Sequence, residues 1–265
     1  MITVSLIITT YNWPKAINKT LHSILNQTRR PDEVIIADDG STPETAKLIN
    51  GFKVSHPEFT IIHSWQEDKG FRLSKSRNIA IKGSKSDYIV LVDGDMILDK
   101  HFIEDHLLVA QKGVLVSGRR ILLNEKYSNK ILENEELPTV MSFGIKKHRL
   151  LGIRSHKLTK LRSSTNQRID GILGCNMGFF RDDAIMVNGF NEAFVGWGAE
   201  DTEFIARLIN NGFYKMKLKH LAFGYHLYHP EASRDFATTN CELLNTTLTE
   251  GLKSCEYGIQ QPSNK

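Results

Sequence analysis

Apolar runs and amphipathic stretches alternate along the first 112 residues of this 265-residue chain. Four runs rich in β-branched residues predict strands buried on both faces, at 4–10, 33–37, 59–63 and 88–92. Apolar residues at three-and-four spacing predict helices between and after them, at 14–25, 42–49, 74–81 and 102–111. Strands that alternate with helices in this way predict an α/β fold with a parallel, doubly wound sheet.

The pattern changes near residue 113. A strand is predicted at 114–123, and periodicity is weak over 124–169. The glycine-rich stretch 170–180 predicts a strand whose backbone approaches a ligand. These features divide the chain into a first half (1–112), a second half (113–236) of the same domain, and a C-terminal helix with a frayed tail (237–265).

Composition narrows the class of protein. A hydrophobic content of 40% with 24% charged residues fits one substantial α/β domain or two small domains that share an interface. The net charge of +4 is too small to indicate a nucleic-acid partner. Cys175, Cys241 and Cys255 are far apart and lack metal-ligand spacing, which favours a reducing compartment. The first apolar run is too short to span a bilayer, so we expect a cytoplasmic protein.

Pairs of acids follow two of the predicted strands. Asp38-Asp39-Gly40-Ser41 ends the second, and Asp93-Gly94-Asp95 ends the fourth. Ligand crevices lie at the carboxyl ends of parallel strands, so one crevice is expected to collect four carboxylates. Gly94 is expected to leave room for a ligand, and the mutual repulsion of the acids indicates a bound divalent cation or hydrogen-bond donors. Each pair alone is also compatible with a solvated turn.

An exposed ring and two acids form the next candidate, in Gly196-Trp197-Gly198-Ala199-Glu200-Asp201. A tryptophan between glycines offers a flat apolar face to a sugar ring. Glu200 and Asp201 precede a helical stretch, where simple helix capping would explain them, as core packing would explain Trp197. Together they fit a sugar hydroxyl and the base that deprotonates it.

His226 and His229 stand three residues apart in an aromatic-rich segment. The alternative to a metal site is that both histidines are ordinary core or surface residues. Imidazole nevertheless binds manganese-like ions well, and the acid crevice needs a ligand opposite Asp95. We favour His226, with His229 as the alternative or a second ligand.

The stretch 137–169 has no acid and eight basic residues. Leu150, Leu151, Ile153, Leu158 and Leu161 are interleaved with the basic residues, which are Lys146, Lys147, Arg149, Arg154, Lys157, Lys160, Arg162 and Arg168. A solvated surface explains this pattern. The sharper hypothesis is that segment 146–168 contacts anionic lipid head groups, at the inner face of a membrane, or an anionic acceptor.

Five motifs in order resemble those of inverting family 2 glycosyltransferases with the GT-A fold. They are Thr10-Tyr11-Asn12, Asp38-Asp39-Gly40-Ser41, Ser76-Arg77-Asn78, Asp93-Gly94-Asp95 and Trp197-Gly198-Ala199-Glu200-Asp201. The second half is similar to β-1,4-galactosyltransferases and bacterial chondroitin polymerase, and the resemblance covers residues 1 to about 235. Ala199 stands where that family often has glycine. The family's fold is a Rossmann-like, mostly parallel sheet flanked by helices, with a smaller acceptor-side subdomain.

The resemblance implies a nucleotide-sugar-binding first half. Thr10, Tyr11 and Asn12 would belong to the uracil pocket, and Asp38 or Asp39 would hydrogen-bond the nucleoside. Arg77 would help to hold the nucleotide, and Asp93 would contact ribose or the sugar.

The resemblance also implies a second half that binds the acceptor and catalyses transfer. Asp95 and His226, or His229, would bind Mn²⁺ or Mg²⁺ on the diphosphate. Asp201 would be the general base and Glu200 would hold hydroxyls. The predicted substrate contacts are Trp197, Gly198 and Asn176.

The predicted function is therefore metal-dependent transfer of a sugar from a UDP-sugar of the galactose, N-acetylgalactosamine or glucose type to a saccharide, with inversion. The setting would be bacterial surface polysaccharide or lipo-oligosaccharide synthesis, with a lipid-linked acceptor as one option. The Gln-x-x-Arg-Trp motif of processive synthases is absent, which favours single-sugar transfer. An inactive carbohydrate-binding or scaffold protein and a sugar nucleotidyltransferase are the alternatives. A Rossmann dehydrogenase is disfavoured because no glycine fingerprint follows the first strand.

Overall fold

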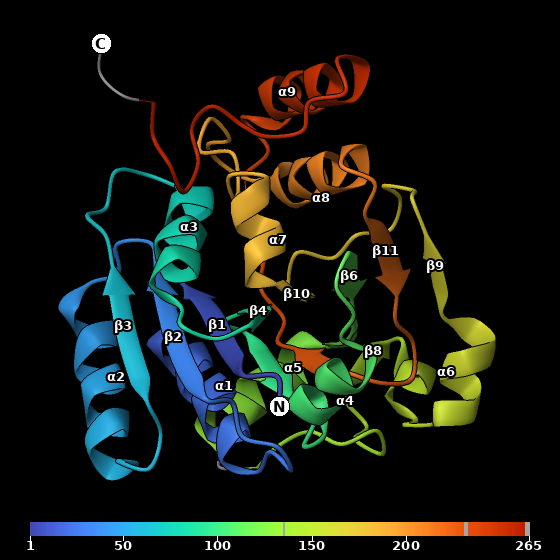
Figure 1. Ribbon diagram of the computed structural model, residues 1–265. Coiled ribbons are helices and arrows are strands. Elements are labelled where there is room, and N and C mark those ends of the chain that lie inside the picture. The colour runs from blue at the N-terminus through green and yellow to red at the C-terminus, as the bar shows by residue number, and fades with distance from the viewer. Residues whose placement is uncertain (135, 231–232, 263–265) are drawn as a thin grey trace.

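The computed structural model describes residues 1–134, 136–230 and 233–262 (Figure 1). The strands are β1 (Val4–Thr10), β2 (Glu33–Asp38), β3 (Ile61–Trp65), β4 (Tyr88–Asp93), β5 (Met96–Leu98), β6 (Val114–Ser117), β7 (Arg119–Leu123), β8 (Ile145–Lys147), β9 (Ser164–Asn166), β10 (Asn176–Phe180), β11 (Tyr214–Lys217) and β12 (Phe223–His226). The helices are α1 (Pro14–Leu25), α2 (Pro43–Ser55), α3 (Leu73–Gly83), α4 (Phe102–Val109), α5 (Glu125–Glu133), the 3₁₀ helix η1 (Arg149–Gly152), α6 (His156–Arg162), α7 (Arg181–Met186), α8 (Glu200–Asn210) and α9 (Ala237–Thr249).

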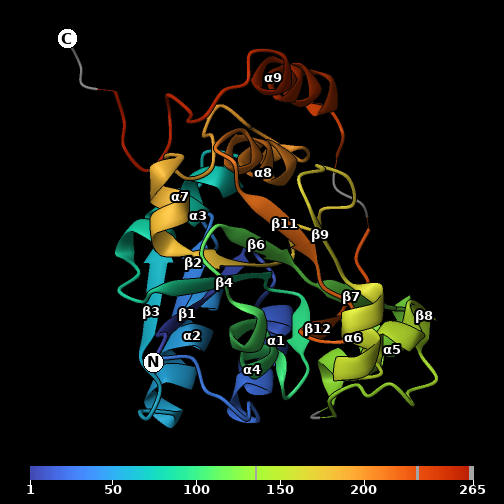
Figure 2. The ribbon, with the colours of Figure 1, turned by 45° about the vertical axis from the view of Figure 1, so that its right-hand side comes forward.

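An eight-stranded sheet forms the centre of the molecule, in the order β3-β2-β1-β4-β10-β6-β11-β9 (Figures 1 and 2). β3, β2, β1 and β4 are parallel, as the alternation of strands and helices predicts. β10 comes from the second half of the chain and runs antiparallel between β4 and β6. The predicted α/β class is confirmed, but the sheet is mixed, because β10 and β9 reverse direction.

Helices cover both faces of this sheet, which explains why its strands read as unbroken apolar runs. Leu6 and Ile8 of β1 point to one face, where they pack with residues of α1, α2 and α4. Ile7 points to the other, where it packs with residues of α3, α7 and α8. All seven residues of β1 are therefore buried.

A second, four-stranded sheet has the order β5-β12-β7-β8. The single strand predicted at 114–123 is wrong, since the chain leaves the first sheet after β6 and enters the second as β7. β12 pairs with both β5 and β7, and this register places His226 opposite Met96, the residue after Asp95. The second sheet, which the sequence did not predict, therefore brings the histidines to the acids.

The C-terminal segment corrects another expectation. After α9 the chain folds back onto the turn after α7, where the Asn188 side chain donates to the carbonyls of Cys255 (2.9 Å) and Gln260 (3.0 Å). The prediction of a frayed tail is therefore wrong for residues 250–262, and the last three residues lie outside the described part of the chain. Within the described part, no helix combines the length and the apolar character needed to cross a membrane.

Helix α8 is anchored by a fully buried ion pair. Arg207 contacts Glu203 through two bonds of 2.8 Å, and it also donates to the carbonyls of Val187 and Gly189. Thr247 of α9 donates to the same glutamate at 3.0 Å. This network fixes α8, whose first residues are Glu200 and Asp201, against the turn after α7 and against α9.

Arg207→Met is expected to lower the free energy of unfolding by about 3–5 kcal/mol, because the Glu203 carboxylate would remain buried without a counter-charge. Urea unfolding followed by circular dichroism measures the loss. The double variant Arg207→Met, Glu203→Leu should recover much of it, and exposed Lys82→Met should change stability by less than about 0.5 kcal/mol. A loss for Arg207→Met no larger than that of the Lys82 control would contradict the anchoring role.

Candidate active site

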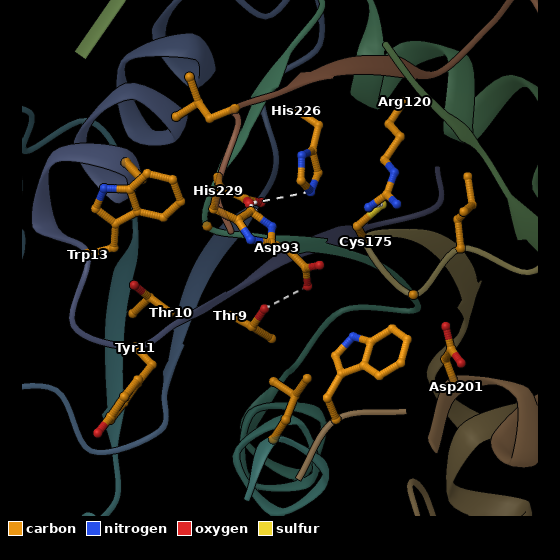
Figure 3. Close-up of a pocket in the computed structure, with 18 of the residues that line it drawn as sticks. Thr9, Thr10, Tyr11, Trp13, Asp93, Arg120, Cys175, Asp201, His226 and His229 are labelled. Carbon is orange, nitrogen blue, oxygen red and sulfur yellow. Dashed lines mark hydrogen bonds and ion pairs between the residues drawn. The ribbon is translucent and has the colours of Figure 1, made fainter. Parts of the chain in front are cut away.

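A cavity of about 820 Å³ opens where β1 and β4 end, and both halves of the chain line it (Figure 3). It brings together residues predicted from motifs more than 100 positions apart. The predicted residues that line it are Thr10, Tyr11, Asp39, Arg77, Asp93, Asp95, Trp197, Glu200, Asp201, His226 and His229.

Four predicted residues do not line the cavity. Asp38 is fully buried and bonds to His63 (2.8 Å) and Ser41 (2.8 Å), so the crevice collects three of the four strand-end acids. Asn12 bonds to Ser41 and Thr42, and it stabilises the turn after β2. Asn176 is fully buried and bonds to His106 and to two backbone carbonyls. Gly198 has a φ of 117° and supplies backbone freedom next to Trp197.

Asp93 and Asp95 both reach the cavity from the end of β4. Asp93 accepts a hydrogen bond from Thr9 on the neighbouring strand (2.9 Å). A Cβ at Gly94 would lie 2.6 Å from the carbonyl oxygen of Thr9, so any side chain there would collide with the protein. The expected role of this glycine was to leave room for a ligand. In the structure a glycine is required at this position because β1 lies too close to the turn for any side chain.

Asp95, His226 and His229 form a three-residue cluster that could hold a metal ion. The Asp95 Oδ2 atom lies 3.4 Å from Nε2 of His226 and 3.3 Å from Nε2 of His229, and one ligand atom of each residue lies within 4.8 Å of the others. The other Asp95 oxygen is buried without a hydrogen-bond partner. Burial raises the pKa of Asp95 and lowers that of His226. A carboxylate and two imidazoles suit a Mn²⁺-like ion, and both predicted histidines belong to the cluster.

Arg77 lies between an acid from each half of the chain. Its guanidinium lies 3.6 Å from Asp93 and 3.1 Å from Glu200, and its carbon centre lies 4.9 Å from the centre of the Phe190 ring. The arginine side chain is only 2% exposed. Burial raises the pKa of Glu200, and the charge of Arg77 opposes that shift. This geometry indicates that Arg77 chiefly positions the two carboxylates.

Arg120 is a cavity residue that the sequence analysis missed. It comes from β7, and Figure 3 shows its side chain reaching toward Cys175. Its guanidinium donates to the sulfur of Cys175 at 3.6 Å, and it makes no ion pair with a carboxylate within the described ranges. Burial raises the pKa of that thiol to about 12, which leaves it protonated at neutral pH. Two arginines inside an otherwise apolar strand, Arg119 and Arg120, were the available signal.

One end of the cavity surrounds the start of α8. Trp197 is 48% exposed, and the guanidinium of Arg234 lies 5.6 Å from the centre of its ring. Asp201 accepts a hydrogen bond from the backbone of Thr202 (2.7 Å). A Cβ at Gly174 would lie 2.7 Å from the Asp201 carboxylate, so this glycine leaves the space that Asp201 occupies.

The opposite end carries two exposed aromatic rings and a buried acid. Tyr11 is held by a hydrogen bond to Asp68 (3.0 Å), and Phe71 lies on the same cavity. Asp39 accepts from Gln66 and from the backbone of Arg72. Its lone pairs are not exhausted by these two donors, so it can accept another N–H group.

The mixed α/β fold and this cavity of acids, histidines and an exposed tryptophan define a glycosyltransferase of the GT-A type. Residues 5–185 match the family described as glycosyl transferase family 2, and the chain therefore belongs to that family. Residues 156–230 also match the N-terminal domain of galactosyltransferase.

Similar proteins agree with this class. Chondroitin synthase of Escherichia coli is 27% identical over 248 residues, which cover 86% of this chain. The structure of TarS of Staphylococcus aureus has a TM-score of 0.61 and 17% identity, and the match covers 92% of this chain and 39% of TarS. Residues 1–349 of TarS are also known in complex with UDP. The mannosyltransferase PcManGT of Pyrobaculum calidifontis, in complex with GDP-Man and Mn²⁺, has a TM-score of 0.60 at 15% identity, covering 95% of this chain and 72% of that one. The chain spans 34% of the length of the chondroitin synthase.

His226→Ala is expected to weaken Mn²⁺ binding by at least about tenfold, since loss of even an outer-shell partner has that effect in metal sites. Isothermal titration calorimetry with the metal alone measures this change without any substrate. Exposed His156→Ala, on α6, is the matched control and should bind as wild type does. Equal affinity in both variants would remove His226 from the ligand set.

Proposed function

We propose that this chain transfers a sugar from a UDP-sugar to a saccharide hydroxyl, with inversion and with a divalent cation bound. The observation that carries the proposal is the shared cavity, in which Asp93, Asp95 and the histidines face Asp201 and Trp197. Asp93 and Asp95 come from the first half of the chain, whereas the histidines, Asp201 and Trp197 come from the second. Their meeting in one space of about 820 Å³ suits an activated sugar and its acceptor.

The aromatic end of the cavity would hold the nucleobase. Tyr11 and Phe71 offer faces for stacking, and Asp39 can accept the ring N–H of uracil. The structure of TarS in complex with UDP supports a uridine donor. PcManGT was solved with a guanosine donor, so the donor panel below includes GDP-mannose.

Asp95, His226 and His229 would hold the cation, which when bound supplies charge neutralisation to the diphosphate leaving group. Arg120 would add a second, permanent positive charge to the cavity, because its guanidinium lies next to Cys175 and makes no ion pair with a carboxylate in the described chain. Arg77 would keep Asp93 directed at the sugar or ribose hydroxyls.

Asp201 is the group we assign as general base. Glu200 is held by Arg77 and is 12% exposed, whereas Asp201 makes no ion pair in the part of the chain that the structure describes. In the proposed step the acceptor oxygen bonds to the anomeric carbon and its proton passes to Asp201. The bond from that carbon to the diphosphate oxygen breaks, and UDP leaves from the opposite face. An α-linked donor would therefore give a β-linked product.

Trp197 would stack on the acceptor, and Glu200 would hold hydroxyls. The similar chondroitin synthase is named for the polysaccharide that it makes. This similarity favours a role in bacterial surface polysaccharide or lipo-oligosaccharide synthesis. The donor would be of the galactose, N-acetylgalactosamine or glucose type. We favour single-sugar transfer, because the chain lacks the Gln-x-x-Arg-Trp motif.

Incubation with Mn²⁺ and a panel of nucleotide-sugars is expected to release UDP from at least one UDP-sugar and no GDP from GDP-mannose. Coupled detection of the released nucleotide measures this, and excess EDTA should abolish release. Full activity in EDTA would contradict the metal assignment. Release from none of the UDP-sugars, with UDP still bound, would favour an inactive binding protein, and release of pyrophosphate from UTP and a sugar phosphate would favour a nucleotidyltransferase.

Asp201→Asn is expected to lower the rate of transfer by about 10²–10⁴, the usual contribution of a positioned base. UDP affinity, measured by calorimetry, should stay within the range of wild type because Asp201 lies on the acceptor side. Asp182→Asn, an acid in the first turn of α7, is the matched control and should retain wild-type turnover. A turnover for Asp201→Asn equal to that of the control would exclude the base assignment.

A further inference from the structure

Segment 141–162 forms an exposed surface that the proposed transfer reaction does not use. Five large apolar side chains on it face solvent: Met141 (79% exposed), Phe143 (102%), Leu150 (66%), Ile153 (47%) and Leu161 (80%). We name this surface the basic apolar patch. A contiguous chain segment with this much apolar exposure marks an interaction site more often than a bare surface.

The basic residues of this segment divide into two groups. Some make contacts within the molecule, since Arg149 donates to the Ser142 carbonyl (2.7 Å) and Arg154 pairs with Asp105 (2.6 Å). Four others are exposed and make no ion pair in the described chain: Lys147, Lys157, Lys160 and Arg162. No acid lies between residues 137 and 169, so these four charges are not neutralised along the segment.

Local geometry gathers the two kinds of side chain. On α6, Lys157 and Leu161 are four residues apart and Lys160 lies next to them, so all three share one face, opposite buried Thr159. Thr159 attaches the helix to the molecule by donating to the Lys219 carbonyl (2.9 Å). Leu150 and Ile153, three residues apart at η1, likewise lie on one side. Figure 2 shows α6 and β8 on the same right-hand side of the molecule.

We propose that the basic apolar patch binds the surface of a membrane that contains anionic lipids. Apolar side chains would enter the region of the acyl chains while the lysines and the arginine meet head-group phosphates. The charge pattern selects this occupant, because a second copy of the chain would bring the same four positive charges against it. An anionic bilayer provides both the opposite charge and the apolar phase.

The position of the patch gives the attachment a consequence, which rests on the proposed function. Lys146 belongs to the same segment and lines the cavity, where it lies 5.8 Å from the ring of Tyr228. The cavity therefore opens next to the patch. An acceptor saccharide carried on a lipid would reach the cavity without leaving the membrane surface.

Vesicle co-sedimentation tests the proposal, with phosphatidylcholine alone compared with phosphatidylcholine mixed with phosphatidylglycerol. The wild-type chain is expected to bind the mixed vesicles and to lose binding as salt rises. Replacing the four exposed basic residues of the patch by alanine should lower the partition coefficient at least about a hundredfold. The matched control removes four exposed lysines elsewhere, Lys15, Lys53, Lys82 and Lys85, and should bind nearly as wild type does.

A second pair of variants isolates the apolar part. Phe143→Ser with Leu161→Ser should weaken binding to mixed vesicles, whereas Val54→Ser with Met186→Ser, also exposed, should not. Equal binding to neutral and mixed vesicles, equal losses in patch and control variants, or a dimer in light scattering that the patch variants abolish would each overturn the proposal. UDP release should be unchanged in the patch variants, and Asp201→Asn should still bind vesicles. The membrane proposal and the transferase proposal can therefore be contradicted independently of each other.

Discussion

The structure depends on balancing the negative charge of carboxylates that gather in one cavity. Asp93, Asp95 and Glu200 come within a small space, and each ionised group there would be costly without a positive partner. The first half of the chain supplies Arg77, which lies 3.6 Å from Asp93 and 3.1 Å from Glu200, and the second half supplies the two histidines that lie beside Asp95. Neither half would therefore assemble this cavity alone, and the insertion of β10 beside β4 fixes the halves in one sheet.

The first half could be predicted well because it uses strong signals. A strand buried on both faces, such as β4, is an unbroken apolar run, and an acid directly after it can only lie at the end of the sheet. The choice between Asp38 and Asp39 could not be made, since adjacent residues leave a strand in different directions and the sequence does not say which one faces the cavity. Asp38 turned toward His63 and Asp39 toward the cavity.

The second half was harder because its position depends on pairing between distant segments. The division between β6 and β7, the reversal of β10 and the register of β12 are set by neighbours far along the chain, and no local periodicity reports them. Asn176 illustrates the difficulty. Its glycine-rich surroundings indicated a ligand contact, yet its side chain serves His106 and two backbone carbonyls inside the sheet. Arg120 was missed for the same reason, since its role appears only when β7 lies beside β12.

The loop before α8 has a strained backbone conformation that lowers stability locally. Gly196, Gly198 and Ala199 all have positive φ, and for alanine the left-handed conformation costs roughly 1–2 kcal/mol. The conformation holds Trp197 out toward solvent and begins the helix directly at Glu200 and Asp201. The strain persists because the Arg207 and Glu203 pair holds the rest of α8 in place. This buried pair begins at Glu203, three residues beyond Glu200, so the first turn of α8 is left to line the cavity.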